Sequence, residues 1–279
     1  MSRSGWLLLA PAGALLAVLG VALASGLLQS LGADSLTGDG RLSLDAYRAL
    51  LGDEPVVSSL GVGLVVASAA TCLAITTGLL TVAAVRAGRR TGRVVATLAA
   101  ATVPLPHLVG AVAFALLLSD SGFLARIVHA APGSFPPWVG GHWYAAVVLE
   151  LAWKESAFIA LVVLAALPAD LEEREDALAV LGAGARRRWL AVSLPASRTA
   201  LVVASTVAFT YALGSYEVAW LLGPALPETL PETAYRLFTS TDFAARPEAF
   251  AATSVLVTAC LGATLAGLSL LRSPARTTP

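Results

Sequence analysis

Four ionisable side chains stand inside runs of apolar residues, and they are the first candidates for chemistry in this sequence. Glu150, Lys154 and Glu155 share one apolar run, and Glu217 lies in the next. A charge near the middle of a bilayer costs about 2.5–3.5 kcal/mol on insertion scales, so such groups usually face a polar interior, for example a solute path. Glu150 and Lys154 are four residues apart on one helix face, which predicts an ion pair. Glu155 lies on another face and has no local partner.

A polar stripe at helical spacing surrounds Glu217. Its members are Thr206, Thr210, Gly214, Glu217 and Trp220. The stripe predicts the lining of a solute path, with small-residue helix packing as the alternative. Gly214 marks a point where the helix is broken or thinned. If Glu155 and Glu217 face the path, their charge favours a cation, to which aromatic rings add cation–π contacts. These rings belong to Trp153, Tyr211, Tyr216 and Trp220.

No catalytic or metal-binding motif accompanies these residues. The sequence contains neither H-E-x-x-H nor G-x-S-x-G, and Cys72 and Cys260 have no metal-ligand spacing. The phosphate loop G-x-x-x-x-G-K-[ST] is absent too, since the only lysine, Lys154, lies in an apolar run. We therefore predict a chain with no ATPase site, metal or cofactor of its own. His107, after Pro106, is interpreted as a helix-end or kink residue rather than a ligand.

The composition places these residues in a membrane. Of the 279 residues 57% are hydrophobic and 13% are charged, whereas soluble domains average about 25% charged. A spanning helix needs roughly 20 mostly apolar residues. Six stretches qualify, at 6–28, 57–85, 94–118, 143–167, 199–222 and 249–271. We predict an all-α protein with six spans in a single domain, 1–279. The net charge of zero gives no indication of a nucleic-acid partner.

The distribution of arginines orients these spans. Loops on the cytoplasmic side carry an excess of basic residues. With the N-terminus inside, most arginines fall on inner segments; these are Arg3, Arg86, Arg89, Arg90, Arg93, Arg174, Arg186, Arg187, Arg188, Arg198, Arg272 and Arg276. The outer loops then hold Arg41, Arg48, Arg126, Arg236 and Arg246. Both termini are therefore predicted to lie inside.

Three loop segments carry helix signals of their own. Residues 43–51, "SLDAYRALL", have helical spacing and are predicted to lie on the membrane surface. "LPET" occurs at 226–229 and again at 230–233, and each proline can begin a short helix. In the charged segment 169–197, Asp170 and Glu173 stand in capping-box relation, and Gly182 can end the helix that follows. Pro195 is predicted to break a second short helix, which makes the segment an inner helix–turn–helix hairpin.

The spacing within 169–197 resembles the signature loop of permease subunits of binding-protein-dependent ABC importers. In that loop Glu-Ala-Ala is followed after three residues by Gly, then by an aromatic residue, and Leu-Pro closes it. The residues to which the resemblance gives the contact with the ATPase are Glu175, Asp176, Ala177, Leu178, Leu181, Gly182, Ala183, Trp189, Leu194 and Pro195. Asp176 replaces the usual Glu and Leu178 the second Ala. Gly182 and Pro195 keep the expected spacing.

The resemblance extends over about 57–271, which matches the six-span importer core in span count and loop order. "TVPLPHLVGAVAFALLLSDSGFL" (102–124) and "ALGSYEVAWLLG" (212–223) are similar to permeases of the polyamine, thiamine and ferric-iron group. The family implies two separate ATPase subunits that bind ATP and Mg, a second permease subunit that is identical or homologous, and an extracytoplasmic solute-binding protein. It also implies location in the plasma membrane of a bacterium.

The cargo and the transport class keep alternatives. We expect import of a small cationic solute such as a polyamine, with a sugar, thiamine or a metal complex as alternatives. A secondary transporter is a rival class, but no internal repeat supports it. An intramembrane enzyme is another, and the sequence has no catalytic motif for it.

Overall fold

The computed structural model describes residues 3–33, 42–88 and 90–272, with side chains described from residue 9 onwards, and every regular element within these ranges is a helix. The chain divides into two compact units. The first comprises Met1–Gly61 and Thr229–Thr258, and the second comprises Val62–Glu228 and Ala259–Pro279. Arg41, Arg89 and Arg276, which contribute to the predicted orientation, lie outside the described residues.

Five helical segments are long and apolar enough to cross a membrane, and each overlaps one of the predicted spans. Within the described residues these segments are Leu9–Ser30, Glu54–Arg86, His107–Ile127, Ala185–Gly214 and Phe243–Arg272. The remaining predicted span, 143–167, forms α7 (Ala145–Ala166), a helix of 22 residues. Three charged side chains, Glu150, Lys154 and Glu155, distinguish it from an ordinary apolar span.

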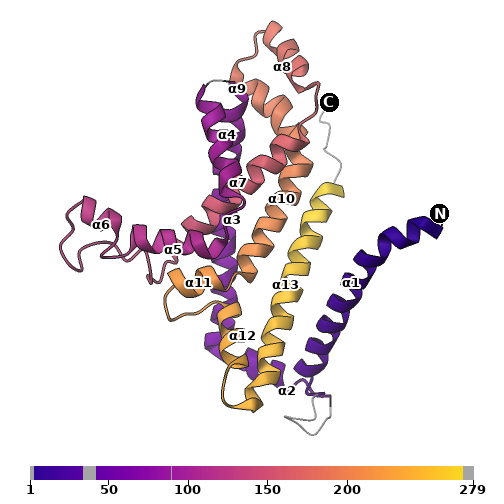
Figure 1. The fold of residues 1–279 in the computed structure, drawn as a ribbon, viewed down its shortest axis with the longest axis vertical. Coiled ribbons are helices and arrows are strands. Elements are labelled where there is room, and N and C mark those ends of the chain that lie inside the picture. The colour runs from indigo at the N-terminus through magenta and orange to yellow at the C-terminus, as the bar shows by residue number, and fades with distance from the viewer. Residues whose placement is uncertain (1–2, 34–41, 89, 273–279) are drawn as a thin grey trace. The chain divides into compact units, whose positions relative to one another are not determined.

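The prediction of one continuous helix at 94–118 is wrong. α4 (Arg90–Thr102) and α5 (His107–Leu118) are separated by a turn that contains Pro104 and Pro106, and the two helices run in different directions (Figure 1). Proline has no N–H group, and the residue before a proline avoids helical backbone, so the helix cannot continue through this turn. α5 alone has 12 residues, about 18 Å of helix, which is shorter than the roughly 30 Å of a hydrocarbon core. The segment His107–Ile127 reaches the length of a span only because it also includes α6 (Phe123–Ile127).

The predicted break after Gly214 is confirmed. α10 (Leu194–Gly214) ends there, and α11 (Glu217–Leu222) begins after two non-helical residues. α11 packs against α5, and both pack against α7, which also contacts α4 and α10. α7 is therefore the central helix of the second unit. Its contacts with α3 (Glu54–Arg86) and α10 are built on small and β-branched residues, which allow helices to approach closely; the buried ones are Ala74, Val82, Ile159, Ala160, Val163, Ala204 and Ala208.

The first unit contains α1 (Arg3–Ser30), α2 (Asp45–Gly52), α12 (Leu230–Phe238), a 3-10 turn η2 (Phe243–Ala245) and parts of α3 and α13 (Arg246–Arg272). The predicted helix at 43–51 is confirmed as α2, whose Leu50 joins a core formed by Leu50, Val56, Leu230, Ala234, Ala251 and Ala252. The hydroxyl groups of Tyr47 and Ser30 are 2.7 Å apart and share a hydrogen bond. α1 leaves its side chains exposed from residue 9 to residue 25.

Only one of the two "LPET" repeats begins a helix. Pro231 lies in the first turn of α12, and the backbone N–H of Thr229 donates to the Glu232 carboxylate at 2.7 Å. Pro227 lies in a bend, so the prediction of a helix there is wrong. Thr229 is the N-cap residue of α12, whereas the equivalent position in the first repeat is Ala225, which has no side-chain acceptor.

The approach of α4 to α3 generates a test of this packing. A Cβ atom at Gly92 would lie 2.5 Å from the carbonyl oxygen of Ala84, whereas one at Gly262 would meet nothing within 4 Å. Gly92→Ala is therefore expected to destabilise the protein by roughly 1–3 kcal/mol, because backbone atoms would have to shift. Gly262→Ala is the control and should be neutral or slightly stabilising. Thermal unfolding of the purified variants measures both, and an unchanged Tm for Gly92→Ala would contradict the packing.

Candidate functional site

The segment 169–197 forms the predicted hairpin at one end of the second unit (Figure 1). α8 (Leu171–Val180) ends at Gly182, whose φ of 82° lies in the left-handed region that glycine tolerates. The N–H of Ala183 donates to the Leu178 carbonyl, and the N–H of Gly182 donates to that of Ala179. These two bonds form a Schellman motif. α9 (Ala185–Arg188) then returns towards the bundle.

The capping box predicted at Asp170 and Glu173 is wrong, although Asp170 does precede α8. The Asp170 side chain makes no cap hydrogen bond. Its carboxylate instead accepts hydrogen bonds from Arg174, at 2.9 Å from Nε and 2.7 Å from Nη2. In this pair both groups are charged, whereas a cap bond joins the carboxylate to a neutral backbone N–H, and Arg174 lies one helical turn away.

Pro195 does not break the helix, which corrects a second prediction. The helical segment is continuous from Ala185 to Gly214. One turn, η1 (Trp189–Ser193), is a π-helix, and the N–H of Leu194 donates to the Trp189 carbonyl. Pro195 lies directly after this turn, in the first turn of α10. In a π-turn each N–H bonds to a carbonyl five residues back, and this wider spacing accommodates a proline, which has no N–H group. The helix therefore continues through Pro195.

The hairpin presents different residues to its two sides. Asp176, Ala177, Val180 and Leu181 are exposed; Val180 and Leu181, at the tip, are 88% and 81% accessible. Glu175 is turned inward instead, to Arg86 at the end of α3. Of the other residues predicted for coupling, Leu178, Ala183, Trp189 and Leu194 are half-buried, and Gly182 and Pro195 are exposed. The hairpin therefore has an apolar, accessible tip and a charged inner side.

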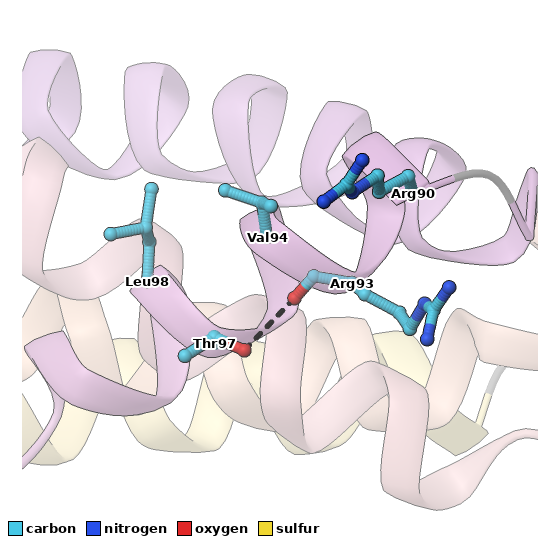
Figure 2. A pocket seen from close by; sticks show the side chains of 5 residues that line it. All are labelled: Arg90, Arg93, Val94, Thr97 and Leu98. Atoms are coloured by element: carbon cyan, nitrogen blue, oxygen red, sulfur yellow. Dashed lines mark hydrogen bonds between the residues drawn. The ribbon is translucent and has the colours of Figure 1, made fainter.

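A second surface lies on the first turns of α4. Figure 2 shows a groove of about 670 Å³ lined by Arg90, Arg93, Val94, Thr97 and Leu98. The Thr97 hydroxyl donates to the Arg93 carbonyl at 3.0 Å, so its polar group is satisfied within the helix. Two guanidinium groups and two aliphatic side chains remain on this face. Such an amphipathic face is typical of a helix end at the level of lipid headgroups.

Within the second unit, the Lys154 side chain binds the backbone at the break between α4 and α5. Its Nζ donates to the carbonyl oxygens of Thr102 (3.0 Å), Val103 (3.3 Å) and Leu105. The ion pair predicted between Lys154 and Glu150 is therefore not formed. The two prolines in the turn remove N–H donors, and the lysine supplies replacements to the carbonyl groups that this leaves free. The charged nitrogen also favours the negative C-terminal end of α4.

His107 brings the two acids of α7 together. Its Nδ1 lies 3.5 Å from Glu150 Oε1, and its Nε2 lies 3.6 Å from Glu155 Oε1. Glu150 is fully buried, and its carboxylate oxygens have no hydrogen-bond partner in the described part of the chain. Glu155 was predicted to have no local partner, and its neighbour is a residue distant in sequence, His107. Burying a carboxylate without a polar partner is costly, and the imidazole of His107 is a polar group that lies close to both carboxylates.

The interpretation of His107 as a helix-end residue is confirmed, since α5 begins there, but it understated the residue's contacts. The signal that could have revealed them was an ionisable side chain within a predicted span. Tyr211 packs over the imidazole, with ring centroids 4.3 Å apart. His107, Lys154, Glu155 and Tyr211 line one cavity of about 190 Å³, together with Val103, Phe158 and Val207. This cavity is the candidate intramembrane site.

The predicted polar stripe does not form one surface. A Cβ atom at Gly267 would lie 2.3 Å from Thr206 Oγ1, and the Thr210 carbonyl lies 3.9 Å from Cys260 Sγ. Thr206 and Thr210 therefore face α13, which supports the alternative of small-residue helix packing. The stripe ends at Gly214 because the helix ends there. Beyond the break, Glu217 and Trp220 are exposed, and Tyr216 stacks on Trp220 at a centroid distance of 6.4 Å.

No metal site accompanies these groups: residues 3–33, 42–88 and 90–272 contain no cluster of three or more His, Cys, Asp or Glu side chains arranged to hold an ion.

Comparison with known proteins identifies relatives of one kind. No family model matches the chain. It is 32% identical over 90 residues to the sulfoquinovosyl glycerol transport system permease protein SmoG of Agrobacterium fabrum, which covers 32% of this chain and 29% of SmoG. It is 29% identical over 241 residues to the inner membrane ABC transporter permease protein YnjC of Escherichia coli, which covers 85% of this chain and 46% of YnjC. The matches thus span less than half of either relative's length.

Solved structures share the fold. A bacterial alginate ABC transporter, in complex with its alginate pentasaccharide-bound periplasmic protein, contains a chain that aligns with a TM-score of 0.75 at 17% identity, over 99% of this chain and 98% of that one. The relatives are ABC transporter permeases, which confirms the resemblance at that level. They do not specify the polyamine, thiamine and ferric-iron group.

The role of Lys154 can be tested on the protein's stability. Lys154→Met keeps an unbranched side chain but removes the ammonium that donates to the three carbonyl groups at the α4–α5 break. The Thr102 carbonyl also accepts from the N–H of Leu105 at 3.2 Å and keeps that bond. We expect the free energy of unfolding to fall by about 1–3 kcal/mol for each carbonyl left without a donor. Ser156→Ala is the control on α7, because that hydroxyl donates only to the Trp153 carbonyl of its own helix. Thermal unfolding in detergent measures both, and equal Tm values for the two variants would refute the role.

Proposed function

We infer that the chain is the permease subunit of an ABC importer. The observation that carries this is the hairpin of α8 and α9, whose exposed tip lies at the end of a bundle that resembles ABC importer permeases in fold and has two ABC permeases as relatives. The protein lies in the bacterial plasma (inner) membrane as a multi-pass protein, in keeping with the name of YnjC.

The proposed topology has six spans with both termini inside, in a single domain over 1–279. Charge supports the orientation, since Arg86, Arg90, Arg93 and the arginines of 186–188 gather at the hairpin end of the second unit. The broken pairs α4–α5 and α10–α11 count as one span each. Irregular backbone within a membrane is tolerated where other parts of the protein satisfy it, and Lys154 does so at the first break.

The proposed partners follow from the surfaces that the chain leaves uncovered. The hairpin tip is proposed to dock on one of two ABC ATPase subunits, which bind ATP and Mg. The exposed face of α1 is proposed to lie against lipid or a second permease subunit. An extracytoplasmic binding protein would deliver the solute, as a periplasmic protein accompanies the alginate transporter. Conformational change would then shift the bundle between two states.

We propose that the solute path passes the cavity of His107, Lys154, Glu155 and Tyr211 and the exposed ring of Trp220. The structure weakens the argument for a cationic cargo, because Glu155 is near His107 and shares its cavity with Lys154. SmoG is named for a sulfoquinovosyl glycerol, and we therefore propose a sugar-type solute. A cation such as a polyamine is the second candidate, which the exposed Glu217 beside two aromatic rings favours.

Docking can be tested at the hairpin tip. Val180→Asp together with Leu181→Asp places two carboxylates where an apolar contact is proposed, and burying them without partners is costly. The variant should insert at the wild-type level, yet retain at least about tenfold less ATPase on co-purification. Glu172→Ala, on an exposed site of the same helix, is the control and should retain it within about twofold. Full ATPase retention by the double variant would contradict docking at the tip.

The cargo can be tested on the complex reconstituted with its ATPase and binding protein. We expect a sulfonated hexose glycoside of glycerol to stimulate ATP hydrolysis by at least about twofold, and spermidine not to do so. Glu217→Gln, which removes one exposed charge at the helix break, should leave this stimulation unchanged. Stimulation by spermidine that Glu217→Gln abolishes would replace the sugar with a cation, because a carboxylate on the path would then be required.

A further inference from the structure

Three elements that are far apart in sequence meet at one ion pair beneath the hairpin. Arg86 is the last residue of α3, Glu175 lies in α8, and Ser193 ends the π-turn that leads into α10. Arg86 Nη1 lies 2.9 Å from Glu175 Oε1, and Nη2 lies 3.0 Å from Oε2. Arg86 Nη1 also donates to the Ser193 hydroxyl at 2.8 Å, and that hydroxyl donates to Glu175.

This contact differs from an ordinary surface ion pair in geometry and in burial. Two parallel N–H···O bonds fix the planes of the guanidinium and the carboxylate, as a single point contact cannot. The two side chains are only 17% and 18% accessible, so water screens them weakly. The hydrogen bond from Arg86 holds the pKa of Glu175 below its ordinary value, so the carboxylate is ionised at neutral pH and loses the pair only in acid.

Because of this pair, the two neighbouring acids Glu175 and Asp176 lie in different surroundings. Asp176 is exposed on the side of the hairpin that faces away from the bundle, whereas Glu175 is turned towards α3 and α10. Glu175 is therefore occupied within the chain and is not free to contact an ATPase. α8 is connected through short turns at 167–170 and 181–184 and contacts α9 and η1, and the pair with Arg86 links it to α3.

We propose that Arg86 and Glu175 form a clasp that joins the hairpin to the ends of α3 and α10, so that a force on the hairpin moves both helices together. This rests on the proposed function, in which the ATPase supplies that force. Arg86 and Glu175 are positioning residues: neither touches solute or nucleotide. Ser193 extends the clasp to the π-turn, which places α10 under the same control.

The test is a charge reversal on the full complex. Arg86→Glu and Glu175→Arg are made singly and together. Arg90→Glu, at the exposed first residue of α4, is the matched control. Three quantities are measured: ATPase co-purification, ATP hydrolysis, and solute transported per ATP hydrolysed. We expect each single variant to keep its ATPase and to lose about tenfold in transport per ATP, and the double variant to recover to within about threefold of wild type, since the pair is restored in reverse. Arg188, near Glu175, makes the recovery incomplete.

Each outcome bears on the clasp separately from the function. If the wild-type chain retains its ATPase and the single variants transport normally, the clasp is refuted and the proposed function stands. If the wild-type chain retains no ATPase, the proposed function fails instead. A double variant as impaired as the single ones also refutes the clasp. Should the reversals not fold, Arg86→Lys keeps the charge but cannot form both bonds; transport per ATP should fall about threefold, and an unchanged value would refute the clasp.

Discussion

Backbone carbonyl groups that lose their helical partners inside a membrane must find a donor, and this constraint governs the second unit. Pro104 and Pro106 remove two N–H donors after the end of α4, and in hydrocarbon no water would replace them. Lys154 donates to three carbonyl groups there from the central helix, α7. The position of α5, and with it the contact of α5 with α11, depends on this arrangement. One long basic side chain thus stabilises an irregular turn that two prolines make unavoidable.

The same arrangement changes the interpretation of the charged residues on α7. An apolar helix that carries two acids and a lysine suggests, at first, a helix lined for a charged solute. Once Lys154 is seen at the break and His107 between Glu150 and Glu155, most of that charge belongs to the framework. Only the part that faces the cavity with Tyr211 remains available to a passing solute.

The sequence predicted the features that depend on local rules. Apolar length located the helices, the left-handed Gly182 ended α8, and Gly214 ended α10. The errors arose where a distant residue or a local competitor decided the outcome. The Asp170 carboxylate binds Arg174 instead of capping α8, and a π-turn accommodates Pro195.

The contacts that define the candidate sites were beyond the reach of pattern alone. Arg86 and Glu175 are separated by 89 residues, and nothing in their spacing connects them. His107 was visible as an ionisable residue in an apolar run, but its two carboxylate neighbours lie on a helix whose rotation the sequence does not give. Helical spacing did place Glu150 and Lys154 on one face. They do not pair with each other, because the carbonyl groups at the α4–α5 break accept the hydrogen bonds of the Lys154 ammonium.

The unbroken helix through Pro195 has a mechanical consequence. From Ala185 to Gly214 the chain forms 30 residues of helix, about 45 Å long at 1.5 Å per residue. One end belongs to the hairpin, and the other end lies at Gly214, after which α11 packs against α5. For a rigid helix of this length, a tilt of a few degrees at the hairpin displaces the opposite end by several ångströms. A break at Pro195 would have absorbed that tilt as local bending, so the widened turn before the proline preserves the reach of the movement.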